Sequence, residues 1–175
     1  MMSVWRTFVV LGLLLAFLAS CGSNVLNVAH SSVPDPAAVI VDVCGGPEIG
    51  AFIERFAKEE DAEENVDARK IVCGDLDGDG NREIAVLFTL ESFHGSNLWS
   101  QYVAVFAGTA SKLDLIDTKA VGGKNLSLVK DIKIENLSIE LSSLDYRPED
   151  ASCCPSLPGS EVLLLAQGHL RVRER

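Results

Sequence analysis

The sequence lacks the short motifs by which many enzymes are identified. It contains no phosphate-binding glycine loop, no dinucleotide-binding fingerprint and no Gly-x-Ser-x-Gly nucleophile elbow. It has only three histidines, and no internal repeat is visible in its 175 residues. After residue 20, no apolar run approaches the length that a membrane-spanning helix needs. The sequence therefore offers no catalytic constellation of a known pattern.

Positive charge is also scarce in this chain. Lys and Arg number 15 against 25 Asp and Glu, which gives a formal net charge of -10. An acidic chain repels phosphate backbones and anionic lipid headgroups. We therefore expect no nucleic-acid partner and no electrostatic docking on a membrane.

The N-terminus has the features of a bacterial export signal. A single early cation, Arg6, precedes the short apolar run 8–17, and small residues follow that run. The stretch Leu18-Ala19-Ser20-Cys21 resembles the lipobox of bacterial lipoproteins. The resemblance implies cleavage after Ser20 and a diacylglyceryl group on the thiol of Cys21. An ordinary secretory signal with a chance cysteine is the alternative.

The resemblance to lipoproteins also implies how the chain is organised. We expect a signal peptide over residues 1–20, a lipidated tether over 21–36 and a single domain over 37–175. Gly22, and not an aspartate, follows the acceptor cysteine. In a Gram-negative cell this implies an outer-membrane location, with the domain facing the periplasm.

Four further cysteines follow Cys21, in neither a CxxC nor a zinc-knuckle spacing. Because export brings them to an oxidising compartment, we expect disulfides. Four cysteines allow three pairings. We favour Cys44–Cys73 together with a bridge between the adjacent Cys153 and Cys154. The alternative ties Cys153 and Cys154 separately to Cys44 and Cys73.

Apolar periodicity predicts one amphipathic helix over residues 47–60. Pro47 suits its first position, and the acidic stretch 59–64 is expected to form a solvated loop. Five apolar residues share one face of this helix: Ile49, Phe52, Ile53, Phe56 and Ala57. The segment before it, 37–43, fits either a strand or a buried helical turn.

The remaining segments favour strands. We predict strands at 71–73, 84–90 and 102–107, with a loop over 91–100 and with 84–90 buried on both faces. A change of parity across Glu135-Asn136 predicts a hairpin, and Gln167-Gly168 predicts a second hairpin turn. The expected fold class is α+β, a mainly antiparallel sheet with one helix near the N-terminus of the domain.

One loop has the composition of a metal site, because oxygen ligands recur at every second position. The candidate ligands are Asp75, Asp77, Asp79, Asn81 through its backbone carbonyl, and Glu83. Val86 stands where an EF-hand has its bidentate glutamate, so the loop is not a complete EF-hand. It resembles the DxDGDGxxD/E loop of FG-GAP and integrin-like β repeats, which implies a structural Ca²⁺. A metal-free Asp-Gly turn is the alternative.

A second resemblance comes from the tail segment Pro148-x-Asp150-x-x-Cys153-Cys154-Pro155. Together with the acidic loop, it is similar to small exported bacterial proteins of unassigned function. This likeness implies export and a compact sheet domain, without an activity. The segment could also be an adaptor surface for a partner protein.

These features predict a lipid-anchored envelope protein with a non-catalytic, β-rich domain for binding or structure. Its expected partners are the membrane, through the lipid, and another envelope protein. The alternative is a periplasmic hydrolase acting on envelope polymers through Glu91 or His94 near the acidic loop. Trp99 and Tyr102 are candidates for a ligand groove or for core packing.

Overall fold

The computed structural model describes residues 44–109 and 112–174. All of them belong to one compact unit, Ile40–Arg175, of the two into which the chain divides. The predicted signal peptide, Cys21, the tether and the apolar segment 37–43 lie outside the described residues. These predictions therefore remain predictions.

The described residues form a mostly antiparallel β structure with one α-helix, as the sequence predicts. The helix is α1 (Pro47–Glu59), and two short 3₁₀ helices are η1 (Val66–Ala68) and η2 (Phe93–Gly95). The strands are β1 (Glu63–Glu64), β2 (Lys70–Gly74), β3 (Glu83–Glu91), β4 (Trp99–Thr109), β5 (Lys112–Gly123), β6 (Ser127–Glu135), β7 (Ser138–Asp145), β8 (Leu157–Ala166) and β9 (His169–Val172). Every strand pairing is antiparallel.

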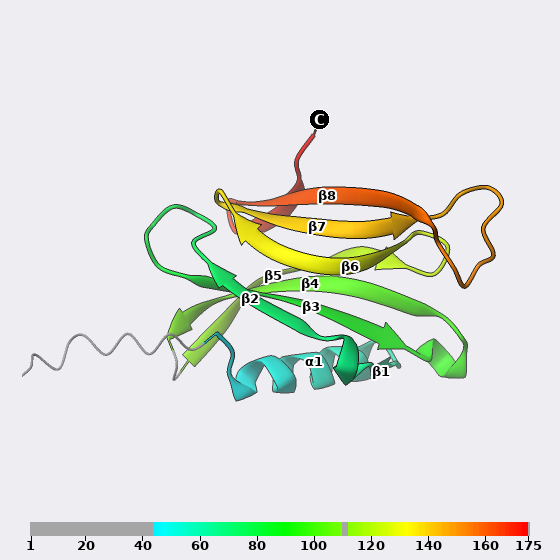
Figure 1. Cartoon of the computed structure of the whole chain (residues 1–175). Coiled ribbons are helices and arrows are strands. Elements are labelled where there is room, and N and C mark those ends of the chain that lie inside the picture. Colours follow the sequence, from blue (N-terminus) through cyan, green and yellow to red (C-terminus); the bar gives the residue numbers. More distant parts are fainter. Residues whose placement is uncertain (1–43, 110–111, 175) are drawn as a thin grey trace, which may run out of the picture. The chain divides into compact units, whose positions relative to one another are not determined.

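Helix α1 forms where its apolar stripe predicts it. Pro47 occupies the first turn, and Ile49 and Ile53 are almost completely buried. Phe52 packs edge-on against Phe106 of β4, with ring centroids 5.4 Å apart. The helix thereby covers one face of β3 and β4 (Figure 1).

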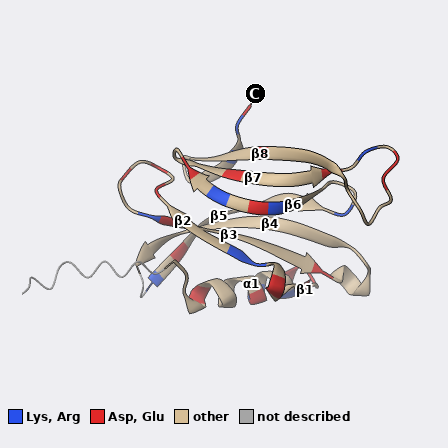
Figure 2. Cartoon of the chain, in the orientation of Figure 1, with Lys and Arg blue, Asp and Glu red and all other residues tan. Residues whose placement is uncertain are grey.

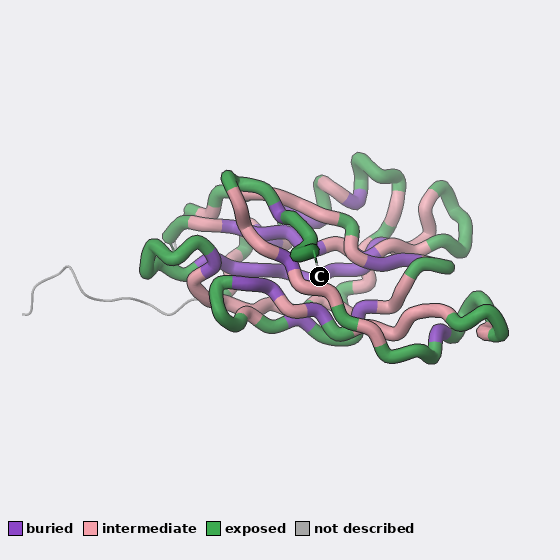
Figure 3. Tube along the Cα trace, turned by 90° about the horizontal axis from the view of Figure 1, so that it is seen from above, coloured by how far each residue is buried: buried purple, intermediate pink, exposed green. Residues whose placement is uncertain are grey.

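Strand β3 is buried on both faces, which confirms its predicted central position. Ile84, Val86 and Phe88 face α1, whereas Ala85 and Leu87 face a second sheet layer. The domain therefore has three layers: the helix, the sheet part β2–β5, and the sheet part β6–β9 (Figure 1). Buried segments run along the middle of the strands, and exposed segments lie at the loops (Figure 3).

The two sheet parts belong to one meander in which successive strands from β3 to β9 are neighbours. The junction between them is narrow, because β5 and β6 share only the pair Gly123↔Ser127. Beyond it, the salt bridge from Lys70 to Asp131, at 3.0 Å, links β2 to β6. A hydrogen bond from the Leu170 N–H to Asp117, at 2.7 Å, links β9 to β5.

Three details differ from the sequence-based predictions. The stretch 59–64 is not all loop, because Glu63 and Glu64 pair with β3 as β1. The first hairpin turn lies at Asn136-Leu137, one residue later than predicted, and both residues have positive φ. Strand β5 was not predicted. The second hairpin turn, Gln167-Gly168, is where the sequence places it.

Candidate metal site at the β2–β3 corner

The acidic loop, residues 75–83, connects β2 to β3. The carboxylates of Asp75, Asp77 and Glu83 each offer an oxygen within 4.8 Å of the others. Such a cluster of hard oxygens could hold a divalent metal ion. The structure therefore brings together three of the five residues that the sequence proposes as ligands.

Local hydrogen bonds explain why the loop folds this way. The Asp75 carboxylate accepts hydrogen bonds from the N–H groups of Gly78, at 2.6 Å, and Gly80, at 3.1 Å. Both glycines have positive φ, +83° and +86°, a conformation that strains residues with a Cβ. Leu76 is only 2% exposed and packs in the core between the sheets. Leu76, which stands between two candidate ligands, therefore anchors the loop to the core.

Glu83 is the unusual member of the cluster, because it is an acidic residue and yet only 3% of it is exposed. Its Oε2 accepts a hydrogen bond from the Leu76 N–H at 2.8 Å. Burial raises the pKa of Glu83; this hydrogen bond lowers it, and the negative charges of Asp77, Asp79 and Asp75 raise it further. A bound cation would offset both the cost of burying a negative charge on Glu83 and its repulsion by the neighbouring aspartates.

Asp79 and Asn81 lie outside the carboxylate cluster. The Asp79 carboxylate accepts hydrogen bonds from the Asn81 N–H, at 2.7 Å, and from its side-chain amide, at 2.8 Å. The bond from the Asn81 backbone is the largest cause that lowers the pKa of Asp79. These two residues therefore build the turn in this structure.

A disulfide fastens the base of the same corner. Cys44, which precedes α1, is joined to Cys73 of β2, with Cα atoms 5.7 Å apart. This is the pairing that the sequence analysis favours. Cys73 lies two residues before Asp75, so the bridge connects the strand leading into the acidic loop to the segment before the helix.

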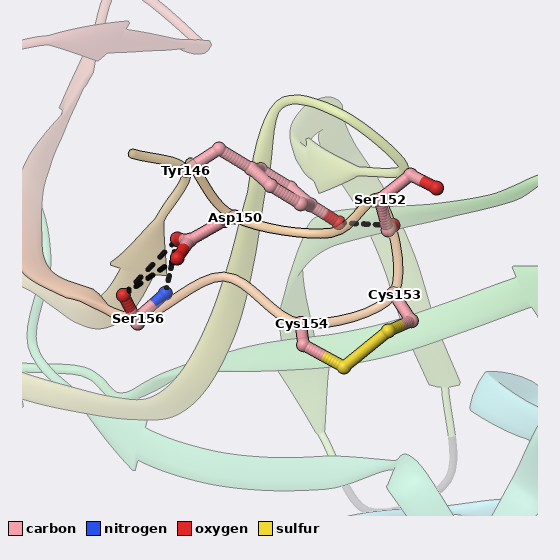
Figure 4. Close-up of a disulfide and its surroundings, with 6 residues drawn as sticks. All are labelled: Tyr146, Asp150, Ser152, Cys153, Cys154 and Ser156. Carbon is pink, nitrogen blue, oxygen red and sulfur yellow. Dashed lines mark hydrogen bonds between the residues drawn. A yellow bond between two sulfur atoms is a disulfide. The ribbon is translucent and has the colours of Figure 1, made fainter. Parts of the chain in front are cut away.

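The second disulfide joins the adjacent Cys153 and Cys154 in the loop between β7 and β8 (Figure 4). The Tyr146 hydroxyl donates to the Ser152 carbonyl at 2.7 Å. The Asp150 carboxylate accepts from the backbone N–H and the hydroxyl of Ser156, each at 2.9 Å. These contacts hold the loop 146–156 in a defined shape.

The hydrolase alternative needs His94 or Glu91 near the acidic loop, and the structure places both elsewhere. Glu83 and Glu91 stand at opposite ends of β3, a separation of about 26 Å. The Glu91 carboxylate accepts a hydrogen bond from the Asn65 amide at 2.8 Å. Exposed His94 follows β3 and contacts exposed Asp61, with 2.7 Å between Nδ1 and Oδ2. The acidic loop therefore has neither His94 nor Glu91 beside it.

The two aromatic candidates lie on opposite faces of the sheet. Tyr102 packs in the helix-side core, with its ring centroid 5.1 Å from that of Phe56. Trp99 instead lines a cleft on the other face, together with the buried Gln101. The sequence analysis missed Gln101, although it is the polar residue that precedes the apolar segment 102–107.

Comparison with protein-family models, curated proteins and solved structures finds no match to this chain. Among the described residues, no helix has the length and apolar character needed to cross a membrane.

Proposed function

We propose that this chain is a lipid-anchored protein of the bacterial envelope with a non-catalytic binding domain. We also propose that a divalent cation, most simply Ca²⁺, stabilises the β2–β3 corner of this domain. The observation that supports the cation is the carboxylate cluster of Asp75, Asp77 and Glu83, and the lipobox-like stretch Leu18-Ala19-Ser20-Cys21 supports the anchor. The cluster lies on a corner tied to the core by Leu76 and to the helix segment by the Cys44–Cys73 bridge.

Calcium suits the cluster because Ca²⁺ takes six to eight oxygen ligands in flexible geometry. Three carboxylates supply up to six oxygens, and water completes the shell at exposed Asp77. The DxDGDG spacing of the loop supports the same ion. The role of this ion is structural, because His94, the base that catalysis would need, lies beyond the far end of β3.

Thermal unfolding with and without calcium tests the cation. Millimolar Ca²⁺ should raise the Tm of the EDTA-treated chain, because a ligand that binds only the folded state stabilises it. Asp77→Asn should abolish most of this rise. Glu149→Gln, which removes an exposed carboxylate from the loop 146–156, is the matched control and should keep it. An equal Tm with and without calcium would remove the cation from the proposal.

Fractionation of cells tests the anchor. The chain should appear in the membrane fraction, with a mass that begins at Cys21 and includes the acyl groups. Cys21→Ser should move it out of that fraction, whereas Ser23→Ala, two residues away, should not. Recovery of the chain in the cytosol with residues 1–20 still attached would contradict the anchor.

A further inference from the structure

One face of the β3–β4 pair changes from apolar to polar along its length. Toward the end of β3, the facing pairs are Ala85↔Val105, Leu87↔Val103, Thr89↔Gln101 and Glu91↔Trp99. The first two pairs belong to the core between the sheets. The last two pairs bring polar groups to this face: the hydroxyl of Thr89, the amide of Gln101, the carboxylate of Glu91 and the indole of Trp99. The face is therefore polar where β3 ends and β4 begins.

These polar residues line a cleft of about 530 Å³, a volume typical of small-molecule sites. Its other walls are η1, the beginning of β6 and Cys153 of the loop 146–156. The cleft lies toward the end of the sandwich at which β5 and β6 share only one residue pair.

Burial makes the polar lining significant. In the part of the chain that the structure describes, the buried polar side chains are Glu83, Thr89, Gln101 and Ser138. Two of them, Thr89 at 6% and Gln101 at 4% exposure, line this cleft. Polar groups are costly to bury unless they find partners. Here Gln101 finds its partners within the fold, in Thr89 and Val129, so the two side chains give the cleft a polar floor.

Hydrogen bonds already fix these side chains in place. The Gln101 amide exchanges two hydrogen bonds with the backbone of Val129, one at 2.7 Å and one at 3.1 Å. It also donates to the Thr89 hydroxyl at 3.4 Å. The Glu91 carboxylate is held by the Asn65 amide. A site with fixed side chains loses less conformational entropy when a ligand binds.

The rim of the cleft is also held in shape. Cys153 lines the cleft, and its bridge to Cys154 closes a small ring that restricts the backbone at this point (Figure 4). Tyr146 and Asp150 hold the rest of the loop through the hydrogen bonds described above. The bridge contributes an uncharged surface close to the polar groups.

We propose that this cleft binds a short neutral saccharide. The inference deepens the proposed binding role and rests on it. Sugar hydroxyls both donate and accept, so they match the Thr89 hydroxyl, the Glu91 carboxylate and the Lys130 ammonium group at once. The C–H face of a sugar ring would pack on the indole of Trp99, because both have an apolar face and polar groups at the edge.

Other ligand classes fit this lining less well. A wholly apolar ligand would cover the charged groups of Glu91 and Lys130, which also line the cleft, without pairing with them. An anionic ligand would meet Glu91 in a chain of net charge -10. On the cationic side of the rim, Lys70 is bonded to Asp131 at 3.0 Å, and Lys130, which also lines the cleft, balances the charge of Glu91. Charges of both signs alternate along the neighbouring β6 (Figure 2).

Calorimetric titration of the full chain, in a detergent without a sugar headgroup, tests this proposal. The probes are maltotriose, cellotriose and chitotriose, with trigalacturonate as the anionic comparison. At least one neutral trisaccharide should bind with a Kd in the millimolar range or below. Trp99→Ala should raise that Kd about tenfold or more, through loss of the stacking surface. Thr89→Val, which keeps the side-chain shape, should also weaken binding.

Leu98→Ala is the matched control. Leu98 is the exposed neighbour of Trp99 and does not line the cleft, so its variant should bind as the wild type does. A thermal melt of each variant separates lost binding from lost folding. The proposal is overturned if no neutral trisaccharide binds at millimolar concentration, if folded Trp99→Ala binds unchanged, or if trigalacturonate binds more tightly. None of these results would alter the calcium-dependent Tm or the membrane fractionation.

Discussion

At the scale of single residues, the carboxylates of the acidic loop divide between two tasks. Asp79 bonds the backbone and amide of Asn81, and so completes the turn. Asp75 supports the turn through two glycine N–H groups and still belongs to the cluster with Asp77 and Glu83. Aspartate side chains commonly bond nearby backbone groups in this way. Metal coordination and turn formation therefore compete for the same oxygens.

This competition limits what the sequence alone can predict about the site. The alternating spacing identifies the loop, in which three of the five candidate ligands, Asp75, Asp77 and Glu83, lie together. It does not show that Asp79 turns toward Asn81, because that depends on the backbone path around two glycines with positive φ. Nor does it show that Glu83 is buried, because the cover over β3 comes from distant strands.

Asp150 provides a prediction about pH. Its pKa is lowered, first by the hydrogen bond from the Arg147 N–H and then by those from Ser156. A carboxyl group with a lowered folded pKa stabilises the fold above its unfolded pKa. That contribution is lost as pH falls through the folded pKa. An NMR titration should therefore show Asp150 protonating below the ordinary aspartate range, with loss of the Ser156 amide shift at the same pH.

Asp150→Asn should remove that transition. The control is Asp114→Asn, at an exposed aspartate on β5, which should leave the Ser156 titration unchanged. An Asp150 pKa at or above the ordinary value would contradict the hydrogen bonds around it.

At the scale of elements, strong periodicity was the part of the sequence that predicted structure well. Helix α1 and strand β3 follow from an apolar stripe and from an unbroken apolar run. Strand β5 carries charged residues on both parities, Asp114 and Lys119 among them, because much of it is half exposed. Strand β1 is only two acidic residues long and is held by pairing with β3. Neither of them has a period that sequence analysis can detect.

Two glycine substitutions should have opposite effects on element stability. Gly50 lies in α1, where a Cβ would have its nearest neighbour, the Arg69 guanidinium, at 3.9 Å. Gly50→Ala should therefore stabilise the fold by about 0.5–1 kcal/mol, through a lower entropy cost. Gly80 has φ +86°, so Gly80→Ala should destabilise it by about 1–2 kcal/mol despite open space around it. Urea unfolding of both variants measures the difference, and effects of the same sign would contradict this backbone argument.

At the scale of the whole molecule, the cleft shows why a site of this kind is hard to predict from one sequence. Its lining comes from η1, β2, β3, β4, β6 and the loop 146–156. The register Thr89↔Gln101 and Glu91↔Trp99 places the polar residues together. Sequence analysis named Trp99 as a candidate for a groove or for core packing. It could not supply Gln101 or Thr89, because the contact of Gln101 with Val129 depends on how the sheet parts come together.

The two disulfides should contribute very differently to global stability. Cys44 and Cys73 are separated by 29 positions, and a bridge over such a loop restricts the unfolded chain by about 3–4 kcal/mol. Cys153 and Cys154 are adjacent, so their bridge closes almost no loop. Replacing Cys44 and Cys73 by Ser together should lower the free energy of unfolding by about that amount. The corresponding double replacement of Cys153 and Cys154 should change it little, and the reverse order in urea unfolding would contradict this assignment.

The order of the strands has a consequence for how the domain acquires its structure. From β3 to β9, each strand pairs with the strand just before it in the chain, so no strand of this run needs a partner from a distant segment. Proteins with local contacts fold quickly, because little loop entropy is lost before each contact forms. A chain that emerges N-terminus first across a membrane can therefore add one hairpin after another. It does not have to hold an unpaired edge open for a distant strand.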